Sequence, residues 1–221
     1  MINQKYITHQ RAPFFEIAKE IIHPQDVVLD VGSGDGGFAV YCNRPDMFML
    51  EGNPDSVKFL KTQFPNVVEG RLPMLPFDNE QFDVIHMSHV IEHLRPEEVY
   101  TTLKEFERCC KPGGAIVISA PLLWEGFYDD LSHIKPYSPG ILKKYMCEGM
   151  VSNSTRSKIS YQFKQERLEY RYLQKNRYTA VNESANIFNI FIFKVYQKLK
   201  RILFKEYERT GYTIVLRKEN H

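Results

Sequence analysis

The chain has 221 residues, of which 43% are hydrophobic and 25% charged, and its formal net charge is +2. These values are typical of one globular domain with a large core, and the small net charge excludes a global attraction to nucleic acid or to membranes. The four cysteines include no C-x-x-C pair, no apolar signal core occurs near residue 1, and no apolar run reaches the length of about 18 residues that spans a bilayer. We therefore expect a cytoplasmic protein with reduced thiols.

The first two thirds of the chain alternate between helical and extended patterns. Apolar spacing and Gly or Pro boundaries predict helices over 11–22, 36–43, 54–64 and 96–110, and strands over 26–31, 47–51, 66–69, 83–88 and 115–119. This alternation predicts an α/β fold with a doubly wound, mostly parallel sheet. Ligands bind such sheets at the carboxyl ends of the strands.

The pattern changes after residue 139. We predict a helix over 140–147, a sixth strand within 150–163 and a final strand over 211–217. Residues 164–208 are interpreted as a helical insert between the last two strands, beginning with a solvated helix over 165–178. Residues 1–221 are expected to form a single domain.

A glycine-rich turn follows the first strand and lies between two carboxylates. Asp30 ends the apolar run, the glycines within 32–37 match the pattern G-x-G-x-x-G, and Glu51 ends the next strand, where a ribose-binding acid is expected. A dinucleotide such as NAD would place its anionic pyrophosphate on this turn, where Asp30 and Asp35 would repel it. S-adenosylmethionine carries an ammonium and a sulfonium and no phosphate, so the pattern favours it over NAD.

Further segments extend this pattern into a set of motifs. They are Leu29 to Gly36, Glu51, Leu75-Pro76-Phe77, Phe82 to Ile85, Val90 to Leu94, and Leu103 to Gly114. Together they resemble the class I S-adenosylmethionine-dependent methyltransferases, nearest to the small-molecule and sugar O-methyltransferases. The resemblance implies a Rossmann-like methyltransferase fold with a seven-stranded sheet of order 3-2-1-4-5-7-6, in which strand 7 is antiparallel.

The same resemblance implies which residues bind S-adenosylmethionine. They are Asp30 near the ammonium, Gly32 and Gly34 as a backbone cradle, Glu51 at the ribose, Asn53, Arg71 and Leu72 around the adenine, and Met87, Ser88 and His89 beside the methionine and sulfonium. Related enzymes often have Asp at the position of Arg71, and arginine cannot accept a hydrogen bond from the adenine amino group. Either the Leu72 backbone serves instead, or Arg71 points to solvent.

A polar loop over 128–139 carries the predicted proton acceptor. A hydroxyl nucleophile usually needs a base, and His133 has a suitable pKa, with Asp130 positioned to orient it. A similar D-x-x-H-x-x-x-Y-S-P stretch occurs in related methyltransferases. In the alternative interpretation, His133 and Tyr137 only hold the following helix in place. His89, at the end of the fourth strand, is the second candidate base.

Two groups resemble metal sites, and we predict no metal at either. The spacing of His86, His89 and His93 is explained by a strand followed by a helix opening, and Asp129 with Asp130 is too common a pair to indicate Mg²⁺.

Three aromatic residues precede the loop: Trp124, Phe127 and Tyr128. They either wall an acceptor pocket or pack as ordinary core, and both interpretations stay open.

Residues 187–205 predict a basic amphipathic helix, with five basic residues and no acidic ones. Its apolar stripe contains Phe188, Phe191, Ile192, Val195, Leu199, Ile202 and Leu203. The favoured interpretation packs this stripe on the sheet or on a second subunit. The alternative places it on an anionic membrane surface, which would locate the protein peripherally at the inner face of the membrane.

These observations predict an S-adenosylmethionine-dependent methyltransferase that O-methylates a sugar, a glycan precursor or another small hydroxylated metabolite. Two alternatives remain: an inactive scaffold or regulatory protein that keeps the fold, and an RNA or protein methyltransferase. The second is disfavoured because Met87-Ser88-His89-Val90 stands where amine methyltransferases carry Asn-Pro-Pro-Tyr/Phe. Nucleic acid is therefore not an expected partner.

Overall fold

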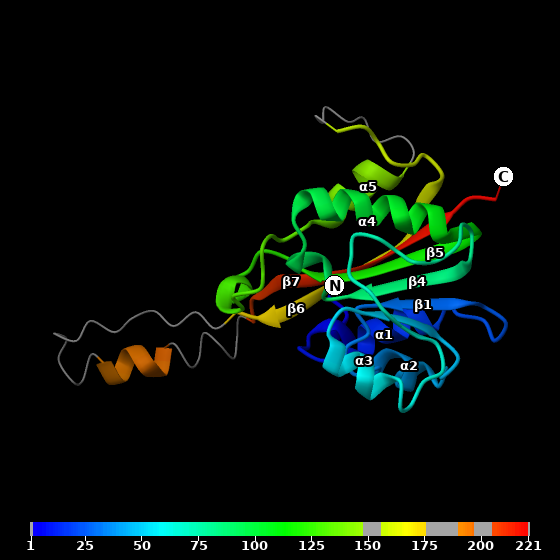
Figure 1. The fold of residues 1–221 in the computed structure, drawn as a ribbon. Helices are drawn as coiled ribbons and strands as arrows, with labels where there is room; N and C mark the ends of the chain where they lie inside the picture. Colours follow the sequence, from blue (N-terminus) through cyan, green and yellow to red (C-terminus); the bar gives the residue numbers. More distant parts are fainter. Residues whose placement is uncertain (1, 148–155, 176–189, 197–204, 221) are drawn as a thin grey trace.

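Seven strands of the described chain form one sheet in the computed structural model, in the order β3-β2-β1-β4-β5-β7-β6 (Figure 1). The structure describes residues 2–147, 156–175, 190–196 and 205–220. The strands are β1 (Val28–Val31), β2 (Phe48–Glu51), β3 (Val67–Glu69), β4 (Phe82–Ser88), β5 (Cys110–Pro121), β6 (Phe163–Gln174) and β7 (Tyr207–Lys218). Strands β1 to β5 pair in parallel, and β7 runs antiparallel to both β5 and β6. The predicted fold class and strand order are confirmed.

Helices cover both faces of this sheet. The helices α1 (Ala12–Lys19), α2 (Gly37–Cys42) and α3 (Pro54–Leu60) lie on one face, and α4 (Pro96–Cys109) and α5 (Pro139–Met146) lie on the other (Figure 1). Three short 3₁₀ turns complete these elements: η1 (Gln4–Tyr6), η2 (Ile91–His93) and η3 (Phe127–Asp129). Among the residues that the structure describes, no helix is both long and apolar enough to cross a bilayer.

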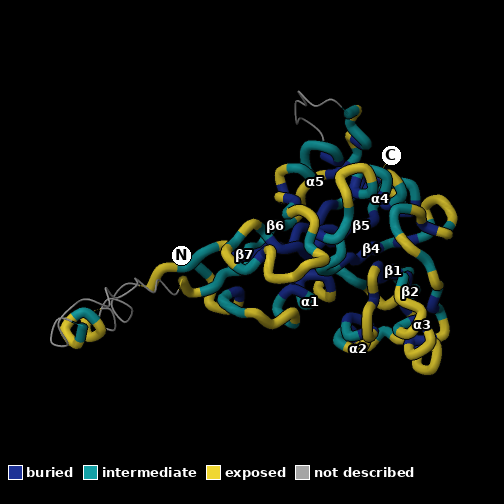
Figure 2. Tube along the Cα trace, turned by 60° about the vertical axis from the view of Figure 1, so that its left-hand side comes forward, coloured by how far each residue is buried: buried dark blue, intermediate teal, exposed yellow. Residues whose placement is uncertain are grey.

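Alternating side chains of the central strands build one core on each face. In β1, Val28 packs with α1 and α2 residues such as Phe14 and Phe38, whereas Leu29 and Val31 pack toward α4 and α5. A sheet covered on both faces needs near-continuous apolar strands, which explains why these segments read as unbroken hydrophobic runs. Figure 2 shows the buried part of the chain concentrated in the central strands.

The sixth strand corrects two predictions. It runs over Phe163–Gln174, and residues 164–174 are strand where a solvated helix was expected. Of the segment 150–163 in which the strand was predicted, residues 156–162 are not strand and residues 150–155 lie outside the described residues. Strand β6 lies at the sheet edge, pairs with β7 alone, and has register shifts at Gln165/Arg167 and Arg171/Tyr172. Such irregularities break the two-residue periodicity that identifies a strand, and an edge strand carries charge on both faces. The helical insert predicted over 164–208 is therefore interrupted at both ends, because 207–208 belong to β7.

Within that predicted insert, residues 190–196 form a helix, as expected. The side chains of Phe191, Ile192 and Val195 are exposed, so these residues of the predicted apolar stripe do not pack on the sheet (Figure 2). The rest of the stripe, at Phe188 and in 199–203, lies outside the described residues.

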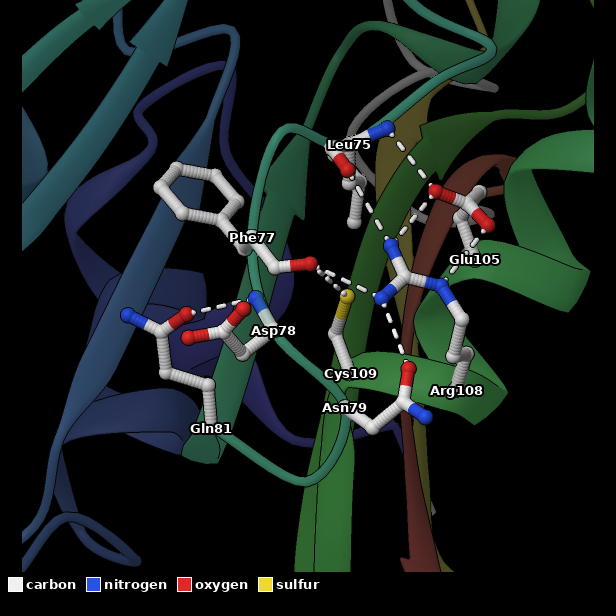
Figure 3. Close-up of polar contacts among 8 residues, drawn as sticks. All are labelled: Leu75, Phe77, Asp78, Asn79, Gln81, Glu105, Arg108 and Cys109. Atoms are coloured by element: carbon white, nitrogen blue, oxygen red, sulfur yellow. Dashed lines mark hydrogen bonds and ion pairs between the residues drawn. The ribbon is translucent and has the colours of Figure 1, made fainter.

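Helix α4 fixes the segment that leads from β3 to β4. The Arg108 guanidinium donates to the carbonyls of Leu75 at 3.1 Å and Phe77 at 2.8 Å, and Glu105 accepts from the Leu75 N–H at 3.0 Å (Figure 3). The same guanidinium is paired with Glu105 at 2.7 Å. Because these bonds reach across to the backbone, they hold the chain just after residues 71–72, which were predicted to contact adenine.

Candidate functional site

The turn after β1 depends on glycine for two different reasons. Gly32, Gly34 and Gly36 have φ values of 70°, 58° and 78°, a region that side chains with a Cβ avoid. A Cβ on Gly32 would also lie 2.4 Å from Cγ2 of Val90, whereas a Cβ on Gly34 would meet nothing within 4 Å. Gly32 is therefore required by packing, and Gly34 borders open space in which a ligand can approach the backbone.

Glu51 lies beside this turn, as the motif spacing predicted. Its carboxylate accepts hydrogen bonds from the backbone N–H groups of Gly34 at 2.8 Å, Gly52 at 2.9 Å and Asn53 at 2.8 Å. Three backbone donors orient both oxygens before any ligand arrives. Two of these bonds end on Oε1 and one on Oε2, so Oε2 keeps a lone pair that can accept a ribose hydroxyl.

Asp30 is buried and already paired. One carboxylate oxygen lies 2.7 Å from Nδ1 of His86, its neighbour on β4, and the His86 ring stacks on Phe38 with centroids 3.7 Å apart. The pair therefore forms part of the core beneath the turn. Binding of the methionine ammonium by Asp30 stays a prediction, and it would have to use the remaining oxygen.

The residues expected around the adenine have contacts of their own. The Asn53 side chain caps α3 by accepting from the Asp55 N–H at 2.9 Å, and Nε of Arg71 donates to the Gly52 carbonyl at 3.2 Å. Arg71 thus reaches toward the turn after β2 and does not extend freely into solvent. The Leu72 side chain packs against the core, so a contact with adenine through its backbone stays a prediction.

The three residues expected beside the sulfonium, at the end of β4, differ in their burial. The Met87 side chain is fully buried in the core on the α4 side, so only its backbone belongs to the strand end, while Ser88 and His89 are partly exposed. His89 has a φ of 57°, and its N–H donates to the Ser119 carbonyl at 2.9 Å. Its Nδ1 lies 3.2 Å from Oε1 of Glu92. Burial lowers the pKa of His89, and the neighbouring Glu92 opposes this effect only in part.

His133 lies in the predicted loop but is oriented differently from the prediction. Its Nδ1 is 2.6 Å from the Phe127 carbonyl, and its Nε2 is 4.0 Å from Oδ2 of Asp130, beyond hydrogen-bond distance. Asp130 instead accepts from the N–H and hydroxyl of Ser132; these bonds lower the pKa of Asp130, and the nearby His133 and His93 act in the same direction. A backbone carbonyl, and not Asp130, therefore sets the ring orientation.

The aromatic residues before this loop divide between the two interpretations. Phe127 is fully buried and packs against the His133 ring, with centroids 4.8 Å apart, so it is core. Tyr128 is exposed and Trp124 is partly exposed, which leaves both available to an acceptor. Tyr137 is buried, and its hydroxyl donates to the Leu94 carbonyl at 2.9 Å, which ties the loop to η2.

The histidines that lie together in the structure differ from the group that the sequence spacing suggested. Within the described part of the chain, His93 meets Glu92 and His133, with one ligand atom of each residue inside a mutual distance of 4.8 Å. His86, paired with Asp30, takes no part. Glu92 was missed as a site residue because the Glu-His-Leu motif explained it as a helix opening, and its contact with His133 joins remote parts of the sequence.

Arg171 is a second residue that the sequence did not reveal. It lies on β6, where a solvated helix was expected, and its guanidinium stacks on Phe14 at 4.6 Å. Burial, together with the charge of Arg11, lowers the pKa of Arg171 to about 10. Its buried Nε has no hydrogen-bond acceptor among the described residues. A desolvated guanidinium with a free donor is suited to binding an anionic or oxygen-rich group.

Comparison with known proteins gives a family match over the part of the chain that carries this site. Residues 29–118, which include the glycine turn and Glu51, match a family described as "Methyltransferase domain". Over this range the chain is similar to a methyltransferase domain. S-adenosylmethionine is the cofactor that this family and fold imply, and Glu51 and the open face of Gly34 fit its ribose and backbone contacts.

Known relatives resemble the chain over part of its length. It is 28% identical over 101 residues to a demethylmenaquinone methyltransferase of Chlorobaculum tepidum, covering 43% of this chain and 41% of that protein. It is 32% identical over 100 residues to a malonyl-[acyl-carrier protein] O-methyltransferase of Herminiimonas arsenicoxydans, covering 43% of this chain and 37% of that protein. The chain thus spans less than half of the length of these two relatives.

A solved structure shows that the methyltransferase fold extends over nearly the whole chain. A SAM-dependent methyltransferase from Archaeoglobus fulgidus superposes with a TM-score of 0.62 at 24% sequence identity, covering 94% of this chain and 92% of that one. Strands β6 and β7, which lie beyond the matched residues 29–118, therefore belong to the same fold.

Proposed function

We propose that this chain transfers the methyl group of S-adenosylmethionine to a hydroxyl of a sugar, a glycan precursor or another small hydroxylated metabolite. The observation that carries the cofactor half of the proposal is the Glu51 carboxylate, held by three backbone N–H groups next to the open face of Gly34. This arrangement supplies a fixed acceptor for a ribose hydroxyl.

The acceptor half of the proposal rests on the carboxyl ends of β4 and β5, where the donated methyl group would lie. His89 is the first residue after β4, and Glu92 lies 3.2 Å from its Nδ1, so its Nε2 is left for an acceptor hydroxyl. His133 is the other candidate base, but its free nitrogen faces Asp130 and the residues around Glu92. An oxygen acceptor is further supported by the printed name of one relative, an O-methyltransferase.

Calorimetric titration with S-adenosylhomocysteine tests the cofactor assignment, with NAD as the control ligand. We expect binding of S-adenosylhomocysteine alone. Glu51→Gln should weaken it by about 10- to 100-fold, because a hydrogen bond to a charged group contributes roughly 1.5–3 kcal/mol. Glu69→Gln is the matched control, since Glu69 ends the neighbouring strand β3 and is exposed. Equal affinity of both variants and the wild type would reject the assignment.

Turnover on a panel of hydroxylated acceptors then separates the two histidines. If His89 accepts the proton, His89→Gln lowers turnover while the affinity for S-adenosylhomocysteine is kept, and His133→Gln has the smaller effect. The reverse order would return the role to His133. Cofactor binding without turnover on any acceptor would favour the inactive scaffold.

A further inference from the structure

Glu92, His93 and His133 form a compact group of metal-binding side chains, called here the Glu-His-His cluster. One ligand atom from each lies within 4.8 Å of the other two. The two segments that carry them are joined through the backbone, because the Glu92 carbonyl accepts from the N–H groups of Ile134 at 2.8 Å and Lys135 at 3.3 Å. The juxtaposition is therefore built into the fold and does not depend on side-chain rotation alone.

Both histidines of the cluster are held in the orientation that suits metal ligands. Nδ1 of His93 lies 3.1 Å from the Ser132 carbonyl, and Nδ1 of His133 lies 2.6 Å from the Phe127 carbonyl. Since a carbonyl can only accept, each Nδ1 carries the hydrogen, and in the neutral ring Nε2 has the free lone pair. Histidines that bind metals nearly always donate their second ring N–H to a carbonyl, a carboxylate or water in this way.

Glu92 supplies the second, independent observation. Its side chain is 1% exposed, and neither carboxylate oxygen accepts a hydrogen bond from the described residues. Nδ1 of His89 is an ion-pair neighbour at 3.2 Å from Oε1, and Oε2 has no such neighbour among the described residues. A buried carboxylate without hydrogen bonds costs several kcal/mol unless a cation compensates it. A metal ion between Glu92 and the two rings would provide that compensation.

We propose that Glu92, His93 and His133 bind one divalent transition-metal ion. Two imidazoles and one carboxylate favour Zn²⁺, Fe²⁺, Mn²⁺ or Co²⁺ over Ca²⁺ and Mg²⁺, which prefer sites made of oxygen ligands alone. Oδ2 of Asp130 lies 4.0 Å from Nε2 of His133 and is exposed, so a small movement brings it, or a water molecule, to a fourth position. The proposal concerns binding and is independent of methyl transfer.

The test titrates chelator-treated, tag-free protein with Zn²⁺ and with Co²⁺, following calorimetry and the visible spectrum of Co²⁺. We expect one equivalent to bind. His93→Gln and Glu92→Gln should each weaken binding by at least about 100-fold, since even the loss of a residue that only orients a ligand costs roughly 10- to 100-fold. His9→Gln is the matched control, because His9 is exposed and far from the cluster in the sequence.

X-ray absorption of the Zn²⁺-loaded wild type supplies a readout that needs no variant. Histidine scattering with Zn–N distances of about 2.0–2.1 Å is the expected result. The absence of stoichiometric binding by the wild type, a spectrum without histidine ligands, or unchanged affinity in a folded His93→Gln protein would each overturn the proposal. Because none of these measurements uses the methyl donor, a failure here leaves the methyltransferase assignment unaffected, and the reverse also holds.

Discussion

The Glu51 carboxylate, at the end of β2, accepts hydrogen bonds from three backbone N–H groups. The Glu92 carboxylate, in η2, accepts none from the described residues and has His89 as an ion-pair neighbour at 3.2 Å. Arg108 and Arg171 differ in the same way, in the number of hydrogen-bond partners. Arg108 has carbonyl and carboxylate partners around most of its guanidinium, but the buried Nε of Arg171 has no acceptor in the part of the chain that the structure describes. Glu51 and Arg108 are thus held by the protein itself, whereas Glu92 and the Nε of Arg171 have no hydrogen-bond partner among the described residues.

This difference indicates which polar groups of the molecule are suited to binding a ligand. Polar groups that the protein itself satisfies are preorganised, and they bind a cofactor without rearrangement. Buried polar groups without partners lower stability, and proteins keep them chiefly where a ligand or ion completes them. Glu51 is held ready for the cofactor that we propose, whereas Glu92 and Arg171 are the buried groups where a bound acceptor or metal ion would supply missing partners.

The largest expected effect on the free energy of unfolding comes from removing one partner of the buried Asp30–His86 pair. Asp30→Ala should lower the free energy of unfolding by about 3–5 kcal/mol, because it leaves Nδ1 of the buried His86 without its partner. Chemical denaturation measures the loss. Asp26→Ala is the control: Asp26 accepts one hydrogen bond from the His23 N–H in an exposed turn, and its loss should cost about 1 kcal/mol. Similar costs for both variants would contradict the assignment of Asp30 to a buried pair.

Two glycines of the turn after β1 allow a sharper comparison. Gly32→Ala should cost about 3 kcal/mol, since it adds a clash with Val90 to the strain of a positive φ. Gly34→Ala should cost only about 1–2 kcal/mol from the φ strain, yet it should weaken binding of S-adenosylhomocysteine because its Cβ enters the open space. Denaturation and calorimetry on both variants check this. Equal destabilisation, with unchanged affinity for Gly34→Ala, would contradict it.

Removing the unpaired donor of Arg171 should leave the free energy of unfolding nearly unchanged or raise it. Arg171→Met keeps the apolar stem against Phe14 and removes a buried donor without an acceptor, so stability should stay constant or rise by up to about 1 kcal/mol. The control is Arg44→Met, which removes hydrogen bonds to the carbonyls of His23 and Asp26 and should destabilise. A clear loss of stability for Arg171→Met would show that the Arg171 guanidinium makes stabilising polar contacts after all.

The smallest effect is expected in the helix of residues 190–196. Ile192→Ser should change the free energy of unfolding by no more than about 0.5 kcal/mol, because the side chain is half exposed and lies off the core. Thermal or chemical denaturation is sufficient to measure it. A loss above about 1 kcal/mol would show that this helix packs in solution, on its own chain or on a second copy.

The central sheet could be predicted from local pattern because strands covered on both faces are apolar throughout and are bounded by Gly and Pro. Glu51 and the glycine turn were found for a related reason: their chemistry lies in two short motifs at consecutive strand ends. Strand β6 was misread as a helix because pairing with β7 decides its conformation, and its bulges disturb the alternation.

The sequence by itself determined the α/β class, the glycine turn with its neighbouring carboxylate, and the methyltransferase resemblance, since each depends on residues close together along the chain. Only the tertiary structure decided that Asp30 pairs with His86, that a carbonyl of Phe127 orients His133, and that Glu92, His93 and His133 meet. These contacts join residues distant in sequence, and their energies depend on burial and on the direction of each hydrogen bond, which exist only once the sheet has formed.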